Sequence, residues 1–144
     1  MSTKEFDREL FYKRLDLLYF IDDEHKKAFV SLTQARGLEW DPEYTTAYYL
    51  LTVDEEIRNS THKHIGSFVD FASIRKNKSF DYLTNKQKLI LDVANNLYNW
   101  HGNPDLLSIV CIHHELYQCV LSAFRLRRGQ YSMGFLDTRG LKSV

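Results

Sequence analysis

Apolar residues recur every three or four positions along most of this chain, and short polar segments separate the apolar runs. This spacing is typical of amphipathic α-helices, and a capping residue stands before most of the runs. The pattern predicts an all-α fold, with five or six helices in one compact, bundle-like domain over residues 1–129. Residues 130–144 carry no such pattern and are expected to form a loosely held tail.

Capping signals place the first three helices. Ser2 with Glu5 is a capping-box pattern, so a first helix is expected to run to about residue 18. Its inward face would hold Phe6, Leu10 and Leu17. Asp22 or Asp23 would cap a second helix that stops at Gly37. Asp41 and Pro42 would open a third, with an apolar stripe of Tyr44, Ala47, Tyr48 and Leu51.

The second half of the chain predicts two longer helices. Between residues 59 and 83 the signal is weak and allows a short helix, two turns or a short strand. Thr84 with Gln87 forms another capping box, and the helix after it would end at Gly102. Its inward residues would be Ile90, Val93, Ala94 and Leu97. Asn103 and Pro104 would then start the last and longest helix, which would end near residue 128.

The segment "IHHELYQC", residues 112–119, raises the question of a metal site. On a continuous helix His113 would lie in the apolar stripe, as a core histidine, and His114 would point about 100° away. The zinc motif H-E-x-x-H is absent. Distant segments could still converge, so a metal-dependent hydrolase or nuclease stays open as the alternative function. Its candidate ligands are His25, His62, His64, His113 and His114.

Charge is balanced overall and uneven along the chain, with 19 bases and 19 acids. Residues 1–57 carry thirteen acids against seven bases, and residues 58–88 carry seven bases against two acids. Two basic segments allow a third function, nucleic-acid binding, which the neutral overall charge does not favour. Its candidate residues are Arg75, Lys76, Lys78, Arg125, Arg127 and Arg128.

Several function classes lack their signatures. The chain contains no G-x-S-x-G nucleophile motif and no glycine-rich phosphate loop, so no enzyme activity and no cofactor is implied. Cys111 and Cys119 would lie about 12 Å apart along one helix, which predicts free, mostly buried thiols. No stretch of 18 apolar residues and no signal peptide is present, so we expect a cytoplasmic protein.

Four segments resemble a family of small uncharacterised proteins, a domain of unknown function found in Firmicutes and their phages. They are "FIDDEHKKAF", "YTTAYYLLTVDEEIR", "DVANNLYN" and "SAFRLRRG", and they span roughly residues 20–129. The resemblance implies a helical domain from a low-GC bacterium or its mobile elements and carries no known reaction. The polar positions that it marks are Glu24, His25, Arg58, Asn96 and Asn99.

These observations favour protein–protein binding, with inhibition or modulation of a host defence or regulatory protein as the biological role. The acidic first half and the abundant aromatic residues motivate this expectation, because aromatic side chains are enriched in interface hot spots. The last helix is apolar around much of its circumference, which also allows a homo-oligomer. The expected contact residues are Asp54, Glu55, Glu56, Tyr48 and Tyr49.

Overall fold

The computed structural model describes residues 6–129, and these residues confirm the all-α class. Within this range no strand forms beyond a single antiparallel bridge between Ile65 and Val69. The α-helices are α1 (Arg8–Arg14), α2 (Asp23–Arg36), α3 (Pro42–Leu51), α4 (Glu55–Thr61), α5 (Phe71–Lys76), α6 (Lys78–Asp81), α7 (Asn85–Asn99), α8 (Leu106–Val110) and α9 (His114–Arg127). Two 3₁₀ turns, η1 (Leu15–Leu17) and η2 (His62–His64), follow α1 and α4. The expected Ser2–Glu5 cap and the tail at 130–144 lie outside the described residues.

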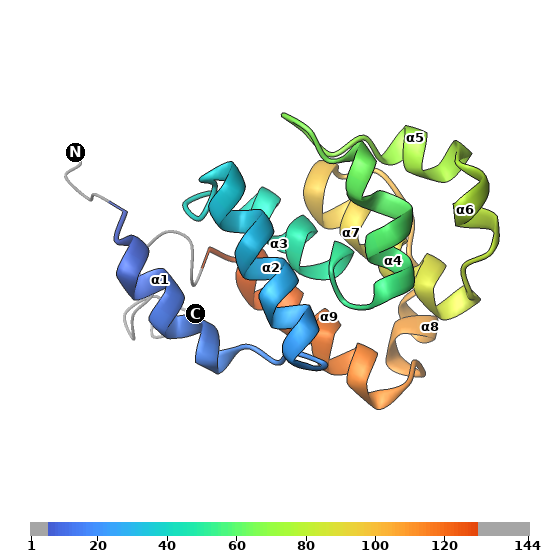
Figure 1. The fold of residues 1–144 in the computed structure, drawn as a ribbon. Helices are drawn as coiled ribbons and strands as arrows, with labels where there is room; N and C mark the ends of the chain where they lie inside the picture. Colours follow the sequence, from blue (N-terminus) through green and yellow to red (C-terminus); the bar gives the residue numbers. More distant parts are fainter. Residues whose placement is uncertain (1–5, 130–144) are drawn as a thin grey trace.

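Helix α3 lies at the centre of the structure, where it packs against α7, α9 and α2 (Figure 1). Its residues 45–51 are all buried, so it is enclosed on every side rather than along one stripe. Such burial fits a helix that is apolar around its whole circumference. Asp41 caps its start by accepting bonds from the backbone N–H groups of Glu43 (2.9 Å) and Tyr44 (3.3 Å). Pro42 occupies the first turn, as predicted.

The carboxyl end of α3 is also buried, so its free carbonyl groups need donors. Thr52 donates its hydroxyl to the Tyr48 carbonyl (2.7 Å). The His25 ring, from α2, donates through Nε2 to the Tyr49 carbonyl (2.9 Å). Arg58, from α4, donates through Nη1 to the Thr52 carbonyl (2.8 Å). Side chains from both neighbouring helices therefore complete the end of α3.

The predicted caps of α2 and α7 are present. Asp22 accepts from the His25 N–H (2.8 Å), and α2 ends at Gly37 in the left-handed region (φ 64°). Thr84 and Gln87 form the reciprocal capping box, at 3.2 and 2.8 Å. Helix α7 ends earlier than expected, because Trp100 rather than Gly102 adopts the left-handed conformation that terminates it (φ 71°).

The first helix has a different register from the predicted one. It begins at Arg8, with Asp7 as its cap, which accepts from the Leu10 N–H (3.1 Å). Of the predicted inward residues, Phe6 packs against the core and Leu10 is partly buried, but Leu17 is 64% exposed, so the prediction is wrong for Leu17. The residues that are buried here are Phe11 of α1, Leu15 of η1, and Leu18, which follows η1 in an extended conformation.

The predicted long final helix is interrupted. Residues 111–113 leave the helical path, and α9 starts with His113 (ψ 141°) as its cap, whose Nδ1 accepts from the Glu115 N–H (3.2 Å). The segment before the break contains β-branched Ile109, Val110 and Ile112, which have lower helix propensity. The placement of His113 in the core is therefore wrong, because its side chain is exposed.

The break also changes the environment of one cysteine. Cys119 is buried in α9, and burial raises the pKa of its thiol to about 12. Cys111 lies at the end of α8 and is exposed, so the prediction of two mostly buried thiols is wrong for this residue. Both cysteines are free, as predicted.

Between α3 and α7 the chain forms short elements. α4, α5 and α6 have seven, six and four residues, and the bridge between Ile65 and Val69 lies in the connection from η2 to α5. Arg36, from the end of α2, donates to the Ile65 carbonyl (2.8 Å) and ties this connection to α2. None of the helices over residues 6–129 is both long enough and apolar enough to cross a membrane.

Candidate functional site

Helix α8 has an exposed apolar face. Nine large hydrophobic side chains are exposed over residues 6–129, and four of them lie between residues 100 and 110. On α8 itself Leu106, Leu107 and Val110 are 75%, 68% and 65% exposed. Their i, i+1, i+4 spacing places them on one side of the helix, while Ile109 is buried and anchors the opposite side. We call the exposed set, Leu106, Leu107 and Val110, the α8 surface.

Local capping holds α8 in place. Asp105 accepts bonds from the backbone N–H (2.9 Å) and the hydroxyl (2.8 Å) of Ser108. These hydrogen bonds hold the pKa of the Asp105 carboxyl below its ordinary value. The carboxylate therefore stabilises the first turn of the helix, and it is already committed to this local role.

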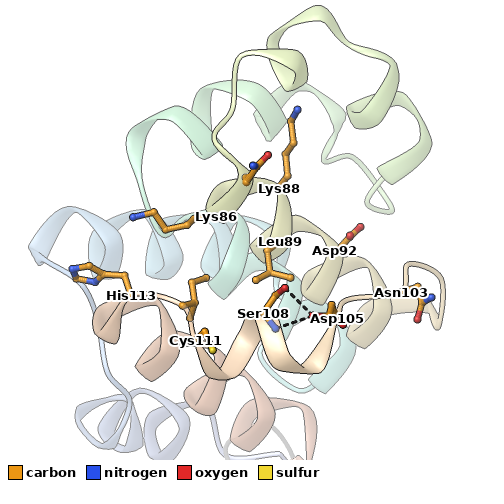
Figure 2. A pocket seen from close by; sticks show the side chains of 11 residues that line it. Lys86, Lys88, Leu89, Asp92, Asn103, Asp105, Ser108, Cys111 and His113 are labelled. Carbon is orange, nitrogen blue, oxygen red and sulfur yellow. Dashed lines mark hydrogen bonds between the residues drawn. The ribbon is translucent and has the colours of Figure 1, made fainter.

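A hollow of about 720 Å³ lies between α8 and the first turns of α7. Figure 2 shows that its lining comes from four places: α7, the loop before α8, α8 itself, and the junction of α8 with α9. The lining is mixed, with lysines and carboxylates around a few apolar groups. It consists of Asn85, Lys86, Lys88, Leu89, Asp92, Asn103, Asp105, Ser108, Cys111, Ile112 and His113.

Two charged groups of this hollow have partners outside its lining. Asp92 forms an ion pair with Arg75, and the Lys88 ammonium lies 5.2 Å from the centre of the Phe80 ring. The His113 ring points away from Cys111 (Figure 2), so the two do not form a nucleophile and base pair.

Two of the three acidic residues at 54–56 form hydrogen bonds within the structure. Asp54 caps α4 by accepting from the Ile57 N–H (2.8 Å). The Gln87 side-chain amide donates to Asp54 (3.1 Å) and to Glu56 (2.7 Å), which joins α4 to the start of α7. Glu55 is exposed. Replacing all three acids would therefore disturb this contact between helices as well as the surface.

Tyr48 and Tyr49 are not surface residues. Both are 0% exposed, because α3 is enclosed by its neighbours, so their predicted role in partner contact is wrong. The Tyr49 hydroxyl donates to the Tyr19 carbonyl, and its ring packs against Phe29 with the centroids 5.9 Å apart. Burial raises the pKa of the Tyr48 hydroxyl to about 12.

The histidines do not converge. His25 is buried between α2 and α3, whereas His113 and His114 are exposed at the start of α9. His62 and His64 belong to η2, where the His64 ring lies 3.3 Å from the side-chain nitrogen of Asn77. Over residues 6–129 no group of three or more His, Cys, Asp or Glu side chains is placed to hold a metal ion.

The basic candidates form no common surface. Arg127 donates to the Leu97 carbonyl (2.7 Å) and lies 3.3 Å from Glu43. Arg75 is paired with Asp92. Helices α5 and α6 lie well away from the end of α9 (Figure 1). The remaining candidates, Lys76, Lys78, Arg125 and Arg128, are exposed and divided between these two places.

The polar positions marked by the family resemblance have structural partners. The Asn96 amide donates to the Gly102 carbonyl (3.3 Å), and the Asn99 side chain accepts from the His101 N–H (3.0 Å). Both hold the turn that follows α7. Glu24 is exposed and pairs with Lys27 at 3.8 Å. The other two marked positions, His25 and Arg58, complete the end of α3.

The α8 surface was not among the predicted contact residues. The signal for it was the apolar character of the last helix around much of its circumference, which indicated either a central position or a contact with another molecule. The break at residues 111–113 separates these two possibilities, because Cys119 and Val120 of α9 are buried and α8 is left exposed. Comparison with protein-family models, with curated proteins and with solved structures found no match.

Proposed function

We propose that this protein acts by binding another protein, and that the α8 surface with the adjoining hollow is the contact site. The observation that carries the proposal is that Leu106, Leu107 and Val110 are each 65% or more exposed on a helix of five residues. Each such side chain gains about 1.5 to 3 kcal/mol when it is fully buried. Burial of these side chains under a partner would therefore stabilise the complex.

The surroundings of the α8 surface fit a protein contact. Interfaces combine a small apolar centre with a polar rim, and here Lys86, Lys88 and Asn103 supply polar groups beside the apolar helix. In measured interfaces a few well-packed residues near the centre account for most of the affinity, and the polar groups around them exclude water. The resemblance to a family of Firmicutes and their phages makes a host-encoded protein the first partner to test, with inhibition or modulation as the effect.

The test compares a surface variant with a matched control. The variant Leu106→Ser, Leu107→Ser, Val110→Ser removes the apolar face and leaves the anchor Ile109 in place. The control, Leu17→Ser, removes a side chain of similar exposure (64%) from a distant element. Circular dichroism and thermal unfolding should show that both variants keep the fold.

Partner capture from a bacterial lysate identifies the bound protein, and its affinity is then measured with purified components. We expect the triple variant to weaken binding at least about a hundredfold, because several buried aliphatic groups are lost. The control should bind like the wild type. Equal affinity for the triple variant and the wild type would exclude the α8 surface. Concentration-dependent self-association lost in the variant would identify a second copy as the occupant instead.

A further inference from the structure

A second hollow, of about 420 Å³, lies between α2 and α4 beside the carboxyl end of α3. It shares no lining residue with the hollow at α8. Figure 1 shows α2 and α4 on either side of the end of α3. The lining residues are Ala28, Ser31, Leu32, Ala35, Leu51, Thr52, Arg58, Thr61, His62 and Ile65.

The side chains of α2 explain why this space stays open. Ala28, Ser31 and Ala35 lie at i, i+3 and i+7, so they share one helix face. Their small side chains leave space above this face. Leu32 and Ile65 supply larger apolar groups to the same hollow. The result is an apolar groove whose volume falls in the range of small-molecule sites, roughly 300 to 1,000 Å³.

The charge of the groove has one sign. No aspartate or glutamate belongs to its lining, whereas Arg58 does. Over residues 6–129 no carboxylate lies within 4.0 Å of the Arg58 guanidinium, since the five ion pairs found there involve other residues. Arg58 donates from Nη1 to the Thr52 carbonyl (2.8 Å), which fixes the side chain at the wall of the groove.

A guanidinium group carries five N–H donors in a rigid fork, so one bond to Thr52 leaves donors for a further acceptor. The partner that matches this fork is a carboxylate, which accepts two parallel hydrogen bonds. An apolar wall next to a fixed arginine without a carboxylate neighbour therefore selects a ligand with two parts, one anionic and one hydrocarbon.

We propose that the groove between α2 and α4 binds a small amphiphile with one carboxylate and an unbranched apolar chain. Arg58 binds the carboxylate, and Leu32 and Ile65 contact the chain. The site is independent of the α8 surface, so the protein can carry a small ligand and a protein partner together.

The first experiment titrates the full chain with decanoate, below its micelle concentration, and follows backbone amide shifts by NMR. Two probes with the same chain length serve as comparison: decanol, which lacks the charge, and decyltrimethylammonium, which reverses it. With decanoate we expect saturable shifts over α2 and α4. Both other probes should bind at least about tenfold more weakly than decanoate, because a charge-assisted hydrogen bond is lost. Equal binding of decanoate and decanol, or decanoate shifts spread over the whole surface, would overturn the proposal.

Two variants test the groove itself. Arg58→Gln keeps a donor for the Thr52 carbonyl and removes the charge, so it should lower decanoate affinity to that of decanol. Ala35→Phe fills the hollow from an exposed position of α2 and should abolish binding of decanoate without unfolding. Its matched control is Ala72→Phe, at an exposed alanine of α5 outside the groove. Wild-type decanoate affinity in the folded Ala35→Phe protein would refute the site even if Arg58→Gln does not fold.

Discussion

Replacing His25 by glutamine should change how the stability of the protein depends on pH. The His25 ring is 0% exposed and bridges two backbone groups. Its Nδ1 accepts from the Ile21 N–H (3.2 Å), and its Nε2 donates to the Tyr49 carbonyl (2.9 Å). This arrangement requires the neutral ring with its proton on Nε2. A second proton, on Nδ1, would face the Ile21 N–H.

Burial lowers the pKa of His25 from its ordinary 6.5 to about 4, despite the bond to the Tyr49 carbonyl, which acts in the other direction. The unfolded chain therefore binds a proton at a higher pH than the folded chain does. The contribution of the neutral ring is complete above pH 6.5 and is lost as the pH falls from 6.5 toward 4. Its total is about 3 kcal/mol, with a slope of about 1.4 kcal/mol per pH unit.

The variant His25→Gln removes the titrating group and keeps one donor for the Tyr49 carbonyl. At pH 7.5 we expect it to be less stable than the wild type by about 2 kcal/mol, from the lost ring packing and the unpaired Ile21 N–H. Below pH 6.5 only the wild type loses stability through protonation of His25 in the unfolded chain. The free energies of unfolding of the two proteins should therefore be equal at about pH 5. Urea unfolding at several pH values between 4 and 7.5 measures both curves. Parallel curves over this range would refute the assigned protonation state.

Three further predictions concern individual positions. Cys111 should react rapidly with Ellman's reagent in the folded protein and Cys119 only after unfolding, because the first thiol is exposed and burial raises the pKa of the second to about 12; two fast thiols would contradict this burial. Trp100→Gly should raise the free energy of unfolding by about 1 kcal/mol, since Trp100 holds a positive φ (71°) and is 81% exposed, and a lower urea midpoint would argue against strain there. Thr84→Ala should cost about 1 kcal/mol in the same assay by removing the cap of α7, and an unchanged midpoint would show that Gln87 alone suffices.

The starts of helices were predictable where the signal is local. Asp22, Asp41 and Thr84 each bond to backbone groups two or three residues ahead, so a few letters of sequence contain the whole interaction. Gly37 ends α2 for a similar reason, since it tolerates the left-handed conformation. These local rules were sufficient for the all-α class and for the positions of α2, α3 and most of α7.

The interruption of the last helix was not predictable from the same rules. Apolar residues recur at helical spacing through residues 106–124, so periodicity indicates one continuous helix and does not mark the break, and Leu106 and Val110 of this run are in fact exposed. The turn at residues 111–113 depends on how the chain passes α7 and on His113 as a cap, a role that histidine seldom fills. The same error concealed the exposed face of α8.

The roles of the marked polar residues needed the tertiary structure. The partners of His25 and Arg58 are carbonyl groups at the end of another helix, 24 and 6 residues away, and no spacing rule connects such pairs. Tyr49 shows the opposite error, because an aromatic residue on a wide apolar face can contact either a partner or the core, and here it is buried.

The enclosure of α3 also bears on how this protein can diverge. Residues 45–51 have neighbours on every side, so a substitution in one of them requires compensating changes in more than one helix at once. The side chains of Leu106, Leu107 and Val110 are mostly exposed within the described chain, so each can be substituted without changes in a neighbouring helix. Distant relatives should thus share the segment "YTTAYYLL" more closely than their α8 residues, and "YTTAYYLL" is the stretch by which to recognise them.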